Sequence, residues 1–315
     1  MTRMGRIIAV DIGGTHVRAA LYEQDHPKPI AHQRTATEAD KPGVYDRLRA
    51  AVEAVWPKDK EVLGIGISSP GPLDPHTGHV LATPNITEWH DFPLAPKLSE
   101  DFGVPAFLSN DANLGALGEW KFGAARGHAN VLYLTISTGV GGGVIEDNRL
   151  VQGYHGLAAE LGHIILDPNG PMCPCGFAGH LEAYASGPSI VRYVLEQIKQ
   201  GVNSSLTAGE GLTARQVAEA ARQGDSLAIS AYRRAGEYLG IGVANFLVSF
   251  DPSIVILGGG VTTAGALLFD PFKASLQKRV FHPRYLENLK IAMSDLGDDV
   301  ALLGALALAQ VSLEH

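Results

Sequence analysis

The stretch IIAVDIGGTHVRAALY, residues 7–22, joins two apolar runs through Asp11, a pair of glycines and Thr15. Apolar runs on either side of a glycine turn predict a β-hairpin, and glycines let backbone N–H groups approach an anion closely. An aspartate at the end of the first strand can face a metal ion, and the threonine can donate its hydroxyl to a phosphate. A plain hairpin turn explains the motif equally well. The G-x-G-x-x-G spacing and following helix of a dinucleotide site do not occur here.

The same layout recurs in VLYLTISTGVGGGVIE, residues 131–146, where a strong strand pattern meets a second glycine turn and another strand. Two such units suggest a fold made by duplication, in which each half offers a phosphate-binding turn. Three further glycines, Gly258–Gly260, follow a buried strand predicted over residues 253–257, and they would let a flat ligand lie against the backbone. The pattern is that of an α/β protein.

Apolar periodicity places the other elements. It predicts strands over residues 31–37, 62–67, 105–108 and 289–294, and helices over residues 42–56, 112–125, 187–199, 213–222, 226–250, 271–280 and 300–311. In the helix over residues 112–125, Glu119 and Lys121 are expected on the face opposite the apolar residues. The segment SSPGPLD, residues 68–74, is predicted to be a rigid loop because turn formers crowd it.

The bulk composition limits the class of protein. At 315 residues the chain is long for one hydrophobic core, so two domains are expected. The formal net charge of −8 argues against a nucleic-acid partner, which a basic surface would favour. The longest clean apolar run, residues 301–309, is too short to span a membrane, and the first residues enter a strand pattern without room for a signal peptide. We therefore expect a cytoplasmic protein without a membrane partner.

The only two cysteines of the sequence, Cys173 and Cys175, lie between His163 and His180 in an H-x9-C-x-C-x4-H pattern. Two thiolates and two imidazoles are ligands that a tetrahedral zinc ion takes. Cysteines separated by one residue are poor disulfide partners, because the bridge would strain the peptide between them. Free cysteines and surface histidines are the alternative. The crowding of these four residues among turn formers favours a metal site.

Asn110 and Asp111 stand at a predicted strand-to-helix junction. Both residue types cap helices well, and such a cap contributes about 1 kcal/mol. On the local sequence alone, a helix cap is the better interpretation of this pair. A chemical role is indicated only when the rest of the chain is considered.

Together these motifs resemble the ROK family of sugar kinases and sugar-responsive repressors over essentially the whole chain, and within it the bacterial glucokinases. The resemblance is carried by DIGGT at 11–15, SPGPLD at 69–74, PN at 84–85, NDAN at 110–113, TGVGGG at 138–143, ELGH at 160–163, CPCGFAGHLE at 173–182 and GGG at 258–260. It implies the actin-like (ribonuclease H-like) kinase fold, in which two α/β domains face a central cleft. Residues 1–118 plus 299–315 would form one domain and residues 119–298 the other.

The resemblance also implies roles for individual residues. Asp111 would be the general base that takes the proton from the 6-hydroxyl of a hexose, and Asn110 would bind neighbouring hydroxyls. Near the anomeric end, the hydroxyls would be bound by Glu160, His163 and Glu182. The phosphoryl donor would be MgATP, with its magnesium ion and phosphates near Asp11, Gly13, Gly14, Thr15, Thr138 and Gly139 and its adenosine near Gly258, Gly259 and Gly260.

Two positions depart from the family pattern. The family usually has a third cysteine where this chain has His180, and imidazole replaces thiolate acceptably at zinc. It commonly has lysine where this chain has His16, which leaves the charge beside the phosphates open. If His163 binds zinc through one ring nitrogen, the other N–H can point at a sugar hydroxyl. The zinc would then be structural rather than catalytic.

The expected function is phosphorylation of a hexose at the 6-hydroxyl with ATP, most of all glucose, by a homodimer or homotetramer. Fructose, N-acetylglucosamine and N-acetylmannosamine are alternative substrates. A sugar-sensing repressor of the same family is a second class, which the position of DIGGT, the acidic charge and both glycine turns disfavour. A zinc-stapled structural protein is a third class, and it leaves the NDAN segment and the glycine turns unexplained.

Overall fold

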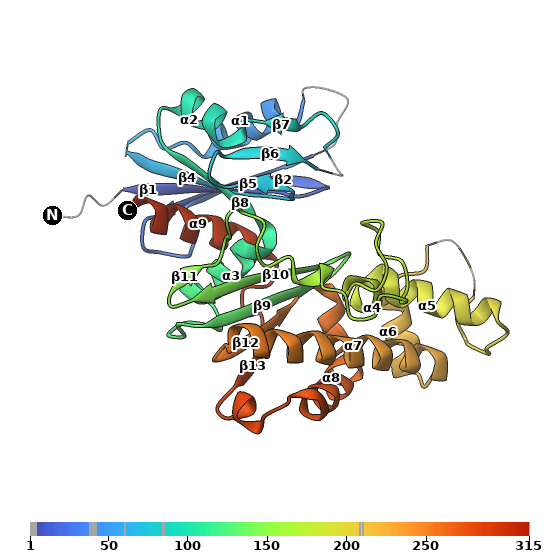
Figure 1. The fold of residues 1–315 in the computed structure, drawn as a ribbon. Helices are drawn as coiled ribbons and strands as arrows, with labels where there is room; N and C mark the ends of the chain where they lie inside the picture. The colour runs from blue at the N-terminus through green and yellow to red at the C-terminus, as the bar shows by residue number, and fades with distance from the viewer. Residues whose placement is uncertain are drawn as a thin grey trace.

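The computed structural model describes residues 5–37, 43–59, 61–83, 86–207, 209 and 211–314. The dipeptide PN at 84–85, which contributes to the family resemblance, lies outside these residues. In the described part of the chain, two five-stranded sheets and their covering helices form two halves that meet through a shared helical layer (Figure 1).

Two large sheets share one strand arrangement. The strands are β1 (Arg6–Ile12), β2 (His16–Glu23), β3 (Ala31–Ala36), β4 (Val62–Ser69), β5 (Leu73–Asp74), β6 (His79–Ala82), β7 (His90–Phe92), β8 (Ala106–Asn110), β9 (Val131–Ile136), β10 (Val140–Glu146), β11 (Arg149–Leu150), β12 (Ile254–Gly258) and β13 (Lys290–Met293). The first sheet has the order β3-β2-β1-β4-β8 and the second β11-β10-β9-β12-β13, while β5, β6 and β7 form a small third sheet. In each large sheet an antiparallel meander of three strands is extended by two parallel strands. This repetition confirms the predicted duplication.

Helices cover and separate the two large sheets (Figure 1). They are α1 (Val44–Val55), α2 (Leu94–Phe102), α3 (Asp111–Phe122), α4 (Glu182–Ala185), α5 (Gly187–Lys199), α6 (Ala214–Arg222), α7 (Ser226–Phe250), α8 (Ala266–Arg279) and α9 (Val300–Leu313), with 3-10 turns η1 (Leu161–His163), η2 (Gly260–Ala264), η3 (Pro283–Leu286) and η4 (Gly297–Asp299). Helices α1 and α2 pack on the outer face of the first sheet, and α4–α8 cover the outer face of the second. Helices α3 and α9 lie between the sheets. Among the described helices, none combines the length and apolarity that crossing a membrane requires.

The middle layer depends on close backbone approach at two glycines. A Cβ at Gly66 of β4 would lie 1.8 Å from the carbonyl oxygen of Ala305 in α9, and a Cβ at Gly304 would lie 2.0 Å from that of Leu114 in α3. Only glycine fits at either position, so α9 packs directly on the first sheet and on α3. The expected domain boundary at residue 118 falls inside the continuous helix α3, and the division into domains stays a prediction.

The segment SSPGPLD was expected to be a loop, and this prediction was wrong in part. Ser68 and Ser69 continue β4, and Leu73–Asp74 forms the short strand β5, which pairs with β6. Further along the chain, α8 begins at Ala266, before the predicted start at Pro271. Most other elements agree with the predicted ranges to within a few residues.

The glycine run of the second hairpin belongs to strand β10 and not to the turn. A Cβ at Gly141 would lie 2.8 Å from Cβ of Ala112, and a Cβ at Gly143 would lie 2.7 Å from Cβ of Ala116. These glycines therefore allow α3 to lie against β10. The phosphate-binding turn expected there is reduced to Ser137–Gly139.

Glu119 is fully buried, so the prediction that it faces away from the apolar residues was wrong. Its Oε1 atom accepts hydrogen bonds from Ser294 Oγ at 2.6 Å and from the backbone N–H of Leu296 at 3.2 Å. Its Oε2 atom accepts from the N–H of Ala124 at 2.8 Å. Ala124 follows α3 on the way to the second sheet, and Leu296 precedes α9 on the way back. The chain thus crosses between the two halves once after α3 and once before α9, and the Glu119 carboxylate is hydrogen-bonded to both of these chain crossings.

We predict that Glu119→Ala lowers the free energy of unfolding by about 2–4 kcal/mol, because three partly buried donors lose their acceptor. Glu119→Gln should lose less, since one amide oxygen can still accept from Ser294. The measurement is urea unfolding followed by circular dichroism. The control is Glu100→Ala on the exposed face of α2. Equal unfolding midpoints for Glu119→Ala, the control and the parent protein would contradict this role for Glu119.

Candidate active site

A cavity of about 400 Å³ lies where the two halves meet, and four predicted site residues line it. Asn110 and Asp111 come from the β8–α3 junction, whereas Glu160 and His163 come from the turn around η1. The cavity is within the size range of small-molecule sites. Two carboxylates, an amide and an imidazole in its wall suit a ligand that carries several hydroxyl groups.

The β8–α3 junction gives different roles to its two polar residues. Asn110 is the N-cap of α3, because its Oδ1 atom accepts the backbone N–H of Asn113 at 2.7 Å. Its amide NH2 group is a donor, separate from this acceptor oxygen. Asp111 is the first helical residue, and it lines the cavity. The helix-cap interpretation therefore applies to Asn110 and leaves the Asp111 carboxylate for chemistry.

The environment of Asp111 favours the protonated carboxyl group. Solvent reaches the side chain through the cavity, but protein surrounds it on the other sides, and this burial raises its pKa. The nearby charges of Asp11 and Glu160 raise it further, so that the pKa is about 6. Burial also raises the pKa of Glu160, with His163 opposing the shift and Glu182 adding to it. A carboxylate with a pKa near 6 is suited to accept a proton at neutral pH.

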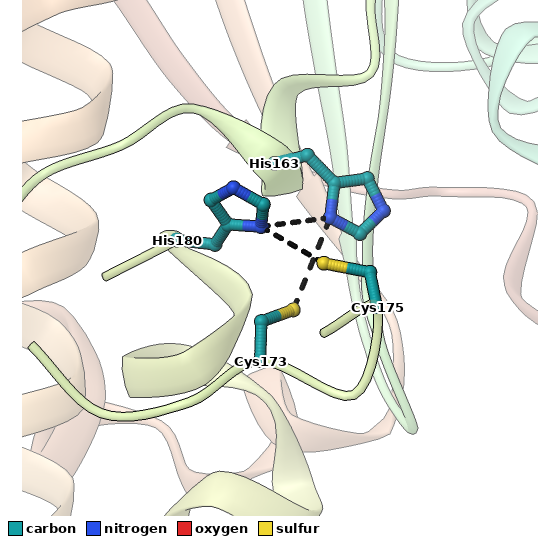
Figure 2. A group of neighbouring side chains, drawn as sticks. All are labelled: His163, Cys173, Cys175 and His180. Atoms are coloured by element: carbon teal, nitrogen blue, oxygen red, sulfur yellow. Dashed lines mark hydrogen bonds between the residues drawn. The ribbon is translucent and has the colours of Figure 1, made fainter. Parts of the chain in front are cut away.

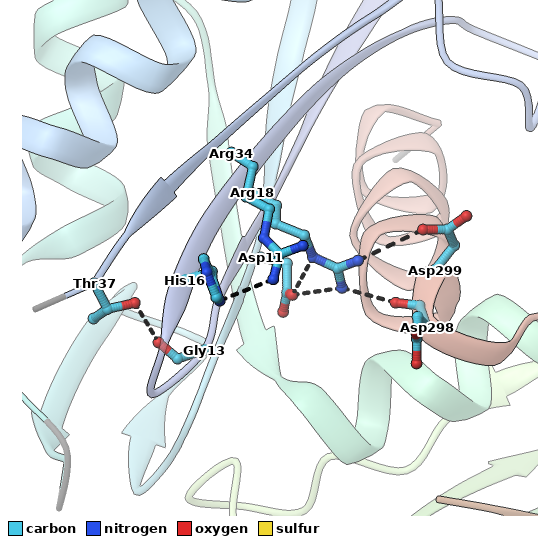
Figure 3. Close-up of polar contacts among 8 residues, drawn as sticks. All are labelled: Asp11, Gly13, His16, Arg18, Arg34, Thr37, Asp298 and Asp299. Atoms are coloured by element: carbon cyan, nitrogen blue, oxygen red, sulfur yellow. Dashed lines mark hydrogen bonds and ion pairs between the residues drawn. The ribbon is translucent and has the colours of Figure 1, made fainter.

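Arg18 holds Asp11 at the end of β1 (Figure 3). The Nε and Nη2 atoms of Arg18 both donate to Oδ2 of Asp11, at 3.0 and 2.8 Å. Among the described residues, no side chain donates to the other oxygen, Oδ1. Arg18 also reaches the second chain crossing, where Nη2 donates to the carbonyl oxygen of Asp298 at 2.8 Å and Nη1 lies 3.5 Å from Asp299 Oδ1. Arg18 therefore fixes which oxygen of Asp11 is left for a ligand.

The first glycine turn is braced by the residue that follows β3 (Figure 3). The N–H of Gly13 donates to the carbonyl oxygen of His16 at 2.9 Å and closes the turn. The hydroxyl of Thr37 donates to the carbonyl oxygen of Gly13 at 2.7 Å, and its N–H donates to that of Thr15 at 2.9 Å. In the described structure, the N–H groups of Gly14 and Thr15 have no hydrogen-bond acceptor. Free N–H groups in a braced turn suit an anion.

The second turn, Ser137–Gly139, borders a second cavity, with a volume of about 780 Å³. The N–H of Ser137 donates to the carbonyl oxygen of Gly139 at 2.8 Å, and Thr138 at the tip is exposed. Besides Ser137 and Thr138, the cavity is lined by Gly187, Pro188, Val191, Arg192, Leu195, Glu196, Lys199, Leu212, Thr213, Ala214, Arg215, Gly260, Val261 and Thr263. An apolar wall with basic residues at its rim suits a flat ring system that carries phosphates.

The three glycines after β12 do not share one role. Gly260 lines the 780 Å³ cavity, whereas Gly258 and Gly259 are not among its lining residues. A Cβ at Gly258 would lie 3.0 Å from Tyr133 Oη. Gly259 has a φ of +89°, and a Cβ there would lie 2.4 Å from the carbonyl oxygen of Ile136. These two glycines allow β12 and its turn to lie close to β9.

The predicted metal ligands converge (Figure 2). One ligand atom from each of His163, Cys173, Cys175 and His180 lies within 4.8 Å of every other. The two Nδ1 atoms are 3.3 Å apart, and the nitrogen–sulfur distances are 3.2 Å for His180–Cys175 and 3.9 Å for His163–Cys173. Tetrahedral zinc with nitrogen at about 2.05 Å and sulfur at about 2.3 Å gives separations of roughly 3.3 and 3.6 Å. The four residues therefore fit such an ion.

Backbone pairing in the ligand loop holds these four residues in place. Ile165 forms an isolated bridge with His180, and Met172 forms one with Ala178. The N–H of Cys173 donates to the carbonyl oxygen of Phe177 at 2.9 Å, which closes a tight turn around Cys175. His163 faces the cluster with Nδ1 and also lines the 400 Å³ cavity. Its ring is thus placed between the Cys/His cluster and the cavity.

Glu182 is not among the residues that line the 400 Å³ cavity. Its Oε2 atom accepts the N–H of Val140, directly after the second glycine turn, at 2.9 Å. Its Oε1 atom lies 3.3 Å from the Cys173 thiol, which donates to it. Glu182 therefore connects the Cys/His cluster with the second turn, and its charge raises the pKa of Glu160.

Similarity to known proteins shows the family of this chain. A profile of the ROK family matches residues 7–312. This chain belongs to the ROK family. The glucokinase of Thermotoga maritima is 38% identical over 307 residues, which cover 95% of this chain and 96% of the relative. A xylose repressor of Caldicellulosiruptor bescii is 31% identical over 313 residues, covering 97% of this chain and 78% of the repressor.

Solved structures of the ROK family share the fold. A ROK glucokinase from Streptomyces griseus, in complex with glucose and AMPPNP, superposes with a TM-score of 0.79 at 35% identity, covering 98% of this chain and 100% of that chain. The comparison confirms the actin-like two-domain α/β fold with a central cleft. ROK proteins include both kinases and repressors, so the reaction has to be argued from the site.

Two residues of the site region were missed by the sequence analysis. Arg18 acts on Asp11, and a signal for this pairing exists in the sequence. A hairpin closed between Gly13 and His16 places position 11 opposite position 18, as the register shows. Glu119 gave no such signal, because its partners Ser294 and Leu296 are remote in the chain.

Proposed function

We propose that this chain is an ATP-dependent hexose kinase that phosphorylates glucose at its 6-hydroxyl. The observation that carries this proposal is Asp111, a carboxylate with a pKa of about 6 that lines a sugar-sized cavity together with Asn110, Glu160 and His163. The glucokinase of Thermotoga maritima and the structure from Streptomyces griseus with glucose and AMPPNP support it.

Phosphoryl transfer depends mostly on positioning and on charge stabilisation. Asp111 accepts the proton of the 6-hydroxyl as that oxygen attacks the terminal phosphorus of ATP, and the bond from this phosphorus to the bridging oxygen breaks and releases ADP. The amide of Asn110, whose oxygen is fixed by the helix cap, donates to a neighbouring hydroxyl. Glu160 and His163 also line the cavity, and they bind hydroxyls near the anomeric end. Glu182 helps to hold the segment that carries Glu160 and His163 in place, through its contacts with Cys173 and Val140.

MgATP is the proposed phosphoryl donor. The phosphates would contact Gly13, Gly14 and Thr15 in the first turn and Thr138 and Gly139 in the second. The adenosine would occupy the 780 Å³ cavity. Of the three glycines Gly258, Gly259 and Gly260, only Gly260 lines this cavity. Asp11 is available to magnesium through Oδ1, and the ion when bound neutralises charge on the transferred group.

We further propose that His163, Cys173, Cys175 and His180 hold one structural zinc ion. The supporting observations are the distances between their ligand atoms and the match of these ligand types to zinc. The ion when bound would stiffen the loop between η1 and α4. That loop places His163 at the sugar cavity and Glu182 at the second turn.

The proposed reaction is tested by ADP release across a panel of glucose, fructose, mannose, N-acetylglucosamine and N-acetylmannosamine. We expect the highest kcat/KM with glucose. Higher turnover of another hexose would correct the substrate and keep the chemistry. Glucose binding without ADP release for any sugar would favour the second candidate, a sugar-sensing ROK regulator, which the likeness to a xylose repressor makes relevant.

The remaining expectations concern the whole molecule. We propose that residues 1–118 plus 299–315 and residues 119–298 act as the two domains. We also propose that the protein is cytoplasmic, works as a homodimer or homotetramer, and binds neither nucleic acid nor membranes.

We predict that Asp111→Asn lowers kcat by about 10²–10⁴-fold, because the amide cannot accept the proton. The variant keeps the shape of the side chain, so its melting temperature and its KM for ATP should change little. Steady-state kinetics at saturating glucose provide the measurement. Asp46→Asn is the matched control, since Asp46 occupies the first turn of α1 on the exposed surface. A folded Asp111→Asn variant with near-normal kcat would rule out this role.

The same assignment predicts a pH dependence. Asp111 must be ionised to accept a proton, so kcat/KM for glucose should fall as pH decreases through about 6, the pKa of this group. The groups that face it are Asp11 and Glu160, both acidic, and neutralising Asp11 should move the fall to lower pH. The test is a kcat/KM profile for the parent and for Asp11→Asn. A profile that is flat on the acid side would contradict the assignment.

We predict about one zinc ion per chain by elemental analysis. Cys175→Ser should lose the metal and raise the KM for glucose by about tenfold or more, because His163 loses its fixed orientation. The KM for ATP should rise less, and zinc retention should weaken as pH falls, since the ligands must be deprotonated. His155→Ala, an exposed histidine of the same segment outside the cluster, is the control. An active protein without zinc, or an unchanged glucose KM in Cys175→Ser, would refute the proposal.

A further inference from the structure

The first glycine turn has a cationic neighbour that the proposed donor site does not yet use. Arg34 on β3 reaches across to His16, where its Nη2 atom lies 3.1 Å from Nδ1 of the imidazole (Figure 3). His16 directly follows Thr15, and its carbonyl oxygen closes the turn by accepting the N–H of Gly13. The Arg34 guanidinium is therefore held beside the end of the turn by its contact with His16.

The strand register places this group on the same face of the sheet as Asp11. Asp11 lies opposite Arg18 in the β1–β2 pair, and Arg18 lies opposite Arg34 in the β2–β3 pair. His16 is two residues before Arg18 on β2, so its side chain projects to the same face. Asp11, Arg18, Arg34 and His16 thus form one polar row beside the turn.

The two arginines of this row differ in charge balance. Arg18 is paired with the carboxylates of Asp11 and Asp299. Within the described residues, Arg34 has no carboxylate at ion-pair distance, and its polar partner is the imidazole of His16. An arginine has no acceptor atom, so Nδ1 of His16 must accept and the ring is held in one orientation. Among the residues that the structure describes, Arg34 is therefore an exposed positive charge with no carboxylate beside it, in a chain whose net charge is −8.

We propose that Arg34, positioned by His16, binds the phosphates of the donor nucleotide at the first glycine turn. A guanidinium presents its N–H groups in a planar fork that matches two phosphate oxygens, and it stays charged at every pH at which the enzyme works. The free N–H groups of Gly14 and Thr15 supply neutral donors at the same turn. The proposal rests on the ATP site proposed above and adds a residue that contacts the donor.

The test compares Arg34→Gln with Arg34→Lys and with Arg49→Gln. Arg49 is the matched control, because it is an exposed arginine of the same half, paired with Glu53 on α1. Arg34→Gln should raise the KM for ATP by about tenfold or more and leave the KM for glucose within about twofold. Arg34→Lys should recover part of the loss, since it keeps the charge but not the fork. Arg49→Gln should behave as the parent protein does.

Two further readouts separate a contact with phosphate from a structural effect. The KM for ATP should rise with ionic strength more steeply in the parent than in Arg34→Gln, because a charge contact is screened by salt. His16→Ala should raise the KM for ATP less than Arg34→Gln does, and the double variant should match Arg34→Gln, as expected for residues that act together. Additive losses, or equal salt dependence, would overturn the proposal.

Direct binding distinguishes failure of this inference from failure of the proposed function. Titration calorimetry with AMPPNP and with inorganic triphosphate, without sugar, needs no turnover. If the parent binds neither, the nucleotide site itself is wrong and this inference falls with it. If the parent binds them and Arg34→Gln binds them equally well at low salt, the ATP site stands and the role of Arg34 is refuted. We expect the parent to bind both, and Arg34→Gln to bind each about tenfold more weakly.

Discussion

Three carboxylates share one small space, and their mutual repulsion is the constraint on which the site depends. Asp11 and Glu160 both raise the pKa of Asp111, which burial raises as well. Like charges in a partly dehydrated site interact more strongly than in water. Two of the three carboxylates have a partner that opposes this repulsion. Arg18 forms an ion pair with Asp11, and His163 lowers the pKa of Glu160. The strongest charges acting on Asp111 are negative, so this carboxylate retains the affinity for a proton that a general base requires.

The features that sequence reasoning found are local ones. A glycine turn between two apolar runs specifies a hairpin by itself, and its recurrence at residues 131–146 was enough to predict the duplication. The convergence of His163, Cys173, Cys175 and His180 could also be predicted, because these four residues lie within one short segment. The sequence did not separate a cap from a base at Asn110 and Asp111, because both side chains cap helices well. That distinction depends on the helix beginning at Asp111, a matter of one residue.

The features that sequence reasoning missed depend on partners far away in the chain. Helix α3 lies between two sheets and is buried on nearly every side, so it has no polar face on which Glu119 could be placed. The carboxylate is instead satisfied by donors on both chain crossings. The glycines at 141 and 143 likewise serve the packing of α3, although in the sequence they look like part of a phosphate turn. Among these features, only the contact of Arg18 with Asp11 could have been predicted, because the register of the hairpin places the two residues opposite each other.

The positive charge beside the first turn is supplied by Arg34 on the neighbouring strand β3, in a chain that has His16 where the family commonly has lysine. A lysine at position 16 would bring its own charge on a flexible chain. His16 instead accepts from Arg34, so the charge reaches the turn from β3. The same strand leads into Thr37, whose hydroxyl and N–H brace the turn. Because the β2–β3 register fixes both contacts at once, the shape of the turn and the position of its cation are set by one strand pairing.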